Sequence, residues 1–303
     1  MSYSRKTRGL FFIFISAIMF GSYGIWSRLI GVGEGIFYPS WTRGLLIALA
    51  LLPILLYKKQ IVPIKRSDWK WMSVYLLATS LTQAPLFYAF NHMNIGTATL
   101  LFFVTMLLTM YAVGVFFLGE KLTKIKTISF ALAFLGLYIT FSFSILVFSI
   151  FAALMAILNG MASGTEVASS KKLTHNYSSL YVVWLSWILI AISNFIISIA
   201  IGERQFSPAL NMFSLYQVGY AVAGILGFWL VIEGVKHVEA SIGGLLGLLE
   251  VVFGILFGML FFHEILTAKI FIGAVCIIFA AALPHVFELY KNSLVETKPF
   301  TKI

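Results

Sequence analysis

One ionisable side chain lies in the middle of an apolar run of the sequence. Residues 241–262 are apolar and long enough to cross a membrane as a helix, and Glu250 is near their midpoint. Its helical face also carries four glycines at steps of three and four residues: Gly243, Gly247, Gly254 and Gly258. Small residues let helices approach closely, so this face is expected to meet protein rather than lipid.

Glu250 is the first candidate for substrate binding. No Lys or Arg is predicted at the same depth, so its carboxylate could bind a cationic group of a substrate, a proton, or each in turn. The structural alternative is a carboxyl group that is hydrogen-bonded between packed helices.

Two further stripes of polar residues lie on predicted membrane helices. One, on residues 147–170, consists of Asn159, Ser163, Glu166 and Ser170, and the other, on residues 10–30, consists of Ser16, Tyr23 and Ser27. Polar groups at bilayer depth usually face the bundle or a watery cavity. Asn159, Glu166 and Tyr23 are therefore candidates for substrate binding, although Glu166 could instead pair with Lys171 or Lys172, about one turn away.

Three more candidates lie on the second and third predicted spans. Arg43 is near the end of residues 38–57, where a long side chain could instead extend to the membrane surface. Gln83 and Tyr88 lie within residues 71–91 and are expected to face a cavity.

The sequence contains no arrangement typical of catalysis, metal binding or cofactor binding. The five histidines are scattered, and His263-Glu264 is not followed by a second histidine at H-E-x-x-H spacing. Gly31-x-Gly33-x-Gly35 lies between two predicted membrane spans rather than after a soluble strand, and Cys276 is the only cysteine. We therefore expect no metal, no cofactor and no enzyme activity.

The composition is that of an all-α polytopic membrane protein. Of 303 residues 60% are hydrophobic and 11% charged, and the mean hydropathy is +0.98. Apolar windows predict ten spans: 10–30, 38–57, 71–91, 96–118, 125–143, 147–170, 178–201, 214–234, 241–262 and 269–290. The net charge of +10 lies in short loops between spans, which argues against nucleic-acid binding.

The distribution of basic residues predicts the orientation. If the N-terminus is cytoplasmic, 17 of the 21 Lys and Arg residues lie inside and three outside, namely Arg28, Arg204 and Lys269. An excess of basic residues marks the cytoplasmic side. Both termini are therefore expected in the cytoplasm, with the chain in the cell membrane and residues 291–303 as a cytoplasmic tail.

The chain is predicted to be an internal duplication. Residues 241–267 align without a gap on residues 97–123 at a shift of 144, with six identities: Leu101/Leu245, Gly114/Gly258, Phe117/Phe261, Glu120/Glu264, Leu122/Leu266 and Thr123/Thr267. Five spans per half is an odd number, so residues 1–143 and 144–290 form two inverted five-helix repeats. Such repeats place a substrate site near the midplane between the halves. Glu120 and Glu264 are expected to brace loops on opposite faces.

An apolar helix that ends in Gly-Glu-x-Leu-Thr, as residues 119–123 do, and that recurs with a central Glu in the second half, resembles the drug/metabolite transporter superfamily, EamA type. Val251 and Leu107 occupy positions where that family usually has proline, so we expect these helices to bend at glycines. The resemblance implies a secondary transporter that exports small organic metabolites or amino acids, as a monomer or homodimer, with proton coupling as an option. A channel, a lipid scramblase and an intramembrane enzyme are the alternatives.

Overall fold

The structure, a computed structural model, describes residues 2–30, 35, 37–93, 95–121, 123–141, 149–205 and 211–296. The predicted boundary between the repeats at 143/144, most of the glycine loop and the end of the tail lie outside these residues. The helices are α1 (Ser2–Gly21), α2 (Tyr23–Ile30), α3 (Phe37–Tyr57), a 3-10 turn (Arg66–Asp68), α4 (Trp69–Ser80), α5 (Ala84–His92), α6 (Ile95–Leu118), α7 (Lys124–Phe141), α8 (Ile150–Leu173), α9 (Ser179–Ala200), α10 (Met212–Val235), α11 (Ala240–Gly247), α12 (Leu249–Phe262) and α13 (Ala268–Glu296).

The predicted ten membrane spans are confirmed. Within the described ranges, nine helical segments are long and apolar enough to cross a membrane; α1 with α2, and α11 with α12, each count as one of them. The tenth is the predicted span 71–91, which is divided into α4 and α5, each too short to cross alone.

The inverted repeat is visible in the way equivalent helices end. α6 and α12 each close with a left-handed residue, Gly119 at φ 72° and His263 at φ 54°, which are 144 positions apart. After each, a backbone N–H reaches six residues back: Glu120 donates to Gly114 O at 2.9 Å and Glu264 to Gly258 O at 3.2 Å. A left-handed residue followed by this long hydrogen bond thus ends both helices, and the duplicated sequence forms the same end twice.

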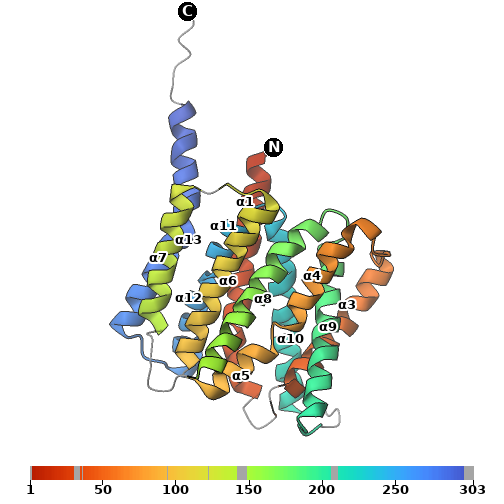
Figure 1. Ribbon diagram of the computed structural model, residues 1–303. Coiled ribbons are helices and arrows are strands. Elements are labelled where there is room, and N and C mark those ends of the chain that lie inside the picture. Colours follow the sequence, from red (N-terminus) through yellow and green to blue (C-terminus); the bar gives the residue numbers. More distant parts are fainter. Residues whose placement is uncertain are drawn as a thin grey trace, which may run out of the picture.

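Packing between the halves follows the same symmetry. The equivalent helices α3 and α9 pack against each other, as do α7 and α13 (Figure 1). Glycines allow the second contact, because a Cβ on Gly136 would lie 2.9 Å from Gly273 O and one on Gly273 would lie 2.7 Å from Gly136 O.

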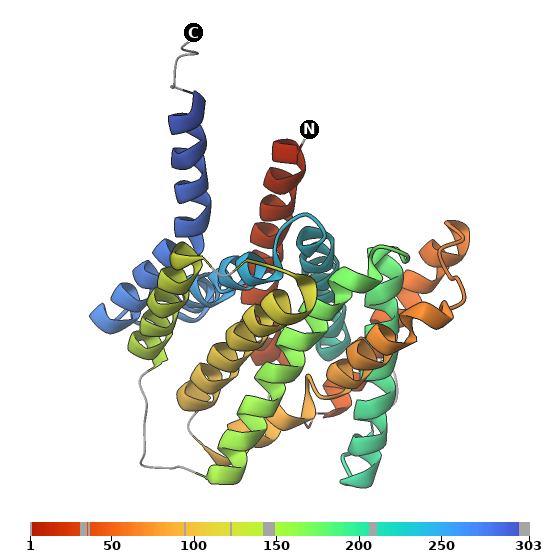
Figure 2. The same ribbon diagram turned by 45° about the horizontal axis from the view of Figure 1, so that its top comes forward.

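The first residues of α1 and the last residues of α13 lie on the same side of the bundle (Figures 1 and 2), which is called the terminal side below; the other is the distal side. Lys6 of α1 forms an ion pair with Glu288 of α13 there. Termini on one side agree with an even number of spans.

Three spans are interrupted where their counterparts are continuous. The interruptions are Ser22 between α1 and α2, residues 81–83 between α4 and α5, and Leu248 between α11 and α12. The equivalent helices α8, α10 and α6 are unbroken. The break at Leu248 adjoins Gly247, as expected for the helix that carries Val251, whereas α6 passes Leu107 without a break. The break at Ser22 adjoins Gly21, in a span for which no bend was expected.

Candidate functional site

A cavity of about 620 Å³ lies between the two halves. Residues beside all three helix interruptions line it, including Gly21 and Tyr23, Thr82 and Gln83, and Glu250. Broken helices at membrane depth are tolerated where their freed backbone groups face protein or water, and in transporters they mark substrate sites. As a result, polar side chains at the three breaks line one cavity.

The cavity reaches towards the distal side. Ser27, at the end of α2, and Glu264, after the end of α12, contribute to its wall. Glu120 and Ser241, on the terminal side, are buried and do not line it. The cavity is therefore open towards the distal side and closed towards the terminal side.

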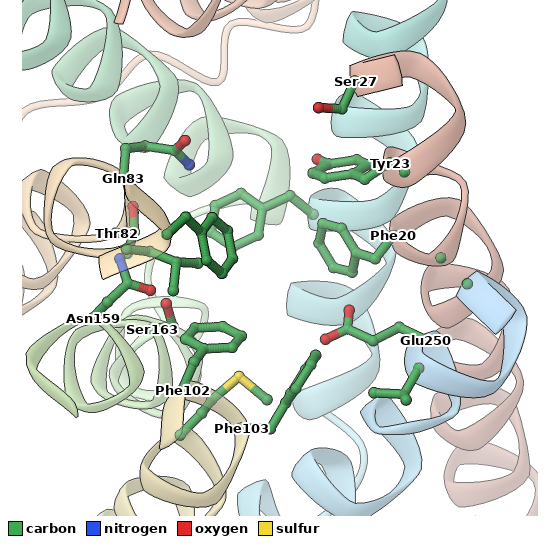
Figure 3. Close-up of a pocket in the computed structure, with 18 of the residues that line it drawn as sticks. Phe20, Tyr23, Ser27, Thr82, Gln83, Phe102, Phe103, Asn159, Ser163 and Glu250 are labelled. Atoms are coloured by element: carbon green, nitrogen blue, oxygen red, sulfur yellow. The ribbon is translucent and has the colours of Figure 1, made fainter. Parts of the chain in front are cut away.

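Glu250 points into the cavity from α12, across from Ser163 and Phe102 (Figure 3). Gly21 of α1 packs beside it, since a Cβ there would lie 3.0 Å from Glu250 O. Over the described ranges, the Glu250 carboxylate has neither a hydrogen-bond donor nor an ion-pair partner. The structural alternative, a carboxyl group satisfied by neighbouring helices, is therefore not what the geometry shows.

Glu166 has a different environment. Its Oε1 accepts hydrogen bonds from Thr79 Oγ1 at 2.6 Å and Ser186 Oγ at 2.5 Å, and the residue is 5% exposed. Among the described residues it forms no ion pair with Lys171 or Lys172; Lys171 Nζ instead lies 3.5 Å from Glu120 Oε1 and donates to Val238 O at 2.6 Å. Glu166 is thus a fixed, hydrogen-bonded carboxyl group in the cavity wall.

Arg43 is buried and surrounded by aromatic rings. Its guanidinium carbon lies 3.9 Å from the ring centre of Tyr220, 5.5 Å from Trp187 and 5.7 Å from Tyr23. The residue is 4% exposed, and its Nε has no hydrogen-bond partner. The side chain therefore does not extend to the membrane surface. The expectation that no cation accompanies Glu250 also needs correction, because Arg43 lines the same cavity.

The amide candidates lie at the break between α4 and α5. Asn159 Nδ2 donates to Leu81 O at 3.1 Å and so satisfies a carbonyl group freed by the interruption. Its Oδ1 is buried without a partner. Gln83 also lines the cavity, opposite Glu250 (Figure 3).

Tyr88 lies outside the cavity. It is 36% exposed and stacks on His92 with ring centres 4.0 Å apart. Six of the seven candidate residues thus meet in one space, and their role in binding stays a prediction.

Sequence reasoning missed the partners of these residues. Thr79 and Ser186 hold Glu166, while Trp187 and Tyr220 surround Arg43. In the sequence, Thr79 and Ser186 could be recognised only as hydroxyl-bearing residues at bilayer depth on the third and seventh predicted spans. Among the described residues, no group of three metal-ligating side chains could hold a metal ion.

Comparison with known proteins identifies the family and the fold. Residues 7–142 and 150–284 each match the model of the EamA-like transporter family. One crystal structure aligns with a TM-score of 0.78 over 92% of this chain and 98% of its own, at 13% sequence identity, which bears on the fold alone. The comparison with curated proteins found no match.

Proposed function

Since the chain belongs to the EamA-like transporter family, we propose that it carries a small metabolite with both a positive and a negative group, such as an amino acid, by alternating access. Its two matched segments are the two halves that rock against each other, with the cavity between them.

The observation that carries this proposal is the pair of opposite charges in the cavity. Arg43 and Glu250 both line it, and in the described part of the chain neither forms an ion pair. Buried charges are costly unless they are paired. A zwitterion whose anionic group meets Arg43 and whose ammonium group meets Glu250 would compensate both charges.

The other walls of the cavity favour an apolar substrate body. Aromatic side chains from several helices line them: Phe20, Phe90, Phe102, Phe103, Phe141 and Phe228. Pockets of this kind obtain affinity from apolar contact and orientation from few polar groups. We therefore favour amino acids with large apolar side chains over sugars, nucleosides or polyamines.

Orientation and direction complete the proposal. The 17 to 3 distribution of basic residues supports a cytoplasmic terminal side, so the cavity faces outward. We propose export, the direction that the family resemblance implies, with Glu250 exchanging the substrate ammonium for a proton.

Purified protein in liposomes tests the proposal. Radiolabelled apolar amino acids should enter saturably, and unlabelled amino acid on the opposite side should accelerate their movement. The matching amine without a carboxylate, and the acid without an amine, should compete much less well. Flux without saturation or counter-transport stimulation would indicate a channel, and equal competition by a neutral analogue would overturn charge-paired recognition.

A further inference from the structure

The duplicated carboxylates Glu120 and Glu264 have different surroundings. Each follows a helix that ends in a left-handed residue, and each folds back over an equivalent glycine, since a Cβ on Gly114 or Gly258 would lie 2.6 Å or 2.3 Å from the carboxylate. The side chain of Glu120 is 3% exposed, whereas that of Glu264 is 44% exposed. Identical local structure therefore ends in two different contacts.

Glu120 caps a helix of the other half. Its Oε2 accepts hydrogen bonds from Ser241 N at 3.1 Å and Ser241 Oγ at 2.6 Å, and its Oε1 accepts one from Ala240 N. These amides begin α11, whose own N-cap residue, Glu239, makes no capping hydrogen bond. An anion at a helix N-terminus is favoured both by unpaired N–H groups and by the helix dipole. Glu120 thus joins α6 to α11 on the terminal side.

Glu264 keeps only part of this arrangement. It pairs with Arg28 at the end of α2, as Glu120 pairs with Lys171 at the end of α8. By the shift of 144, the groups equivalent to Ala240 and Ser241 are Gly96 and Thr97, at the start of α6. In this structure Glu264 instead pairs with Arg28 and lines the open cavity.

We propose that Glu120 and Glu264 are two latches that close in alternation: Glu120 on the start of α11 when the cavity faces the distal side, and Glu264 on the start of α6 when it faces the terminal side. In an inverted repeat, the opposite state is obtained by exchanging the conformations of the halves. The closed contact of Glu120 is therefore the template for the contact that Glu264 makes after the exchange. Thr97 supplies the hydroxyl that Ser241 supplies here. The inference rests on the proposed alternating access.

Labelling from each side of sealed vesicles tests the latches. The reporter is Ser163→Cys, a cavity position, with Cys276→Ala, and the probe is a membrane-impermeant maleimide. Glu120→Gln leaves one acceptor oxygen for three donors, so it should move labelling towards the terminal side. Glu264→Gln should move it towards the distal side. We expect the ratio of terminal-side to distal-side labelling rates to change about fivefold, which corresponds to the loss of one capping interaction. Glu233→Gln is the control, because the partners of this terminal-side carboxylate are Ser179, Lys236 and His237, and it should shift labelling towards neither side.

Cross-linking gives a second test, in which Glu120, the latch on the terminal side, stays intact. Oxidation of the pair Thr97→Cys and Glu264→Cys should form a disulfide in the terminal-facing state and abolish distal labelling of a cavity cysteine.

The outcomes separate the two proposals. If the reporter is labelled from both sides, but E120Q and E264Q act alike or not at all, the latches are wrong and alternating access stands. If no variant is ever labelled from the terminal side, both proposals fail.

Discussion

At the scale of single residues, Arg43 and Glu250 are the two charges that the fold leaves uncompensated in one cavity. Arg43 is held by the faces of three rings, which leaves guanidinium N–H groups free to bind. A planar guanidinium binds a carboxylate through two parallel hydrogen bonds, which an ammonium group cannot reproduce. If the substrate is a zwitterion, as proposed, substitution of Arg43 should weaken binding of its anionic group, and substitution of Glu250 should weaken binding of its ammonium group.

Arg43→Lys keeps the charge but loses the planar, stacked geometry. We expect its half-saturation constant for an amino acid to rise about tenfold, the loss of one charge-assisted hydrogen bond, while the constant for the corresponding amine changes little. Arg8→Lys is the matched control, because Arg8 also lies over a ring, that of Phe12 at 5.0 Å, yet outside the cavity. An equal rise for the amine would mean that Arg43 supports the fold rather than the substrate carboxylate.

Glu250→Gln preserves the shape and removes the ionisation. If Glu250 exchanges a proton for substrate, this variant should lose the pH dependence of transport while its melting temperature stays near that of the unaltered protein. Transport rates across a pH series in liposomes measure this, with Glu288→Gln on the terminal side as the control. An unaltered pH profile would move proton coupling to another residue, such as Glu166.

Asp68, outside the membrane, gives a pH effect on stability. Desolvation opposes ionisation, but hydrogen bonds from Tyr177 at 3.0 Å, Asn176 at 2.9 Å and Ser67 outweigh it and lower the pKa of Asp68 below its usual value. A lowered pKa means that stabilisation is present above the unfolded value, about 3.9, and is lost as the pH falls through the folded value. The melting temperatures of the unaltered protein and Asp68→Asn should differ at pH 7 and converge below about pH 4. A constant difference would contradict this.

At the scale of helices, the interruptions position the site. α1 and α12 cross at Gly21, where a Cβ would lie 2.6 Å from the Cβ of Phe253. Glu250 lies at the same crossing, so close contact of the two backbones sets its position.

Gly21→Ala should therefore destabilise the protein by about 1–3 kcal/mol, as overpacking does. Gly24→Ala, three residues later, meets nothing within 4 Å and should be neutral or stabilising. Thermal unfolding of both variants in detergent compares them directly. Equal stability would show that α1 and α12 can separate at no cost.

Element boundaries show what sequence could and could not predict. Apolar length and charge predicted ten spans, and the shift of 144 predicted the repeat, because bilayer thickness and duplication act on every residue in a span. The breaks at Ser22 and Leu248 were not located, since without proline a helix breaks where tertiary contacts favour it. Arg43, by contrast, was found through its charge, but its rings come from α2, α9 and α10 and are adjacent only in the folded chain.

At the scale of the whole molecule, the orientation gives a further prediction. Reporter tags inserted at Lys65 and after Glu296 should both be cytoplasmic, and a tag at Arg204 should be external, because basic residues are retained inside. Accessibility of the tags in intact cells and in permeabilised cells measures this. A cytoplasmic signal at Arg204 would contradict the inverted topology.

The two closures of the molecule are unequal. On the terminal side, Lys126, whose side chain is 5% exposed, pairs with Glu239 at 2.5 Å, beside the Glu120 latch. The shift of 144 places Ile270 and Ile95 at the equivalent distal positions, where no such pair can form. If the terminal side is cytoplasmic, as proposed, we expect the empty protein to favour the outward-facing state, and binding from the inside to be weakened by the lower fraction of inward-facing molecules. For the proposed export, we therefore expect substrate to leave the cell only when its internal concentration is high.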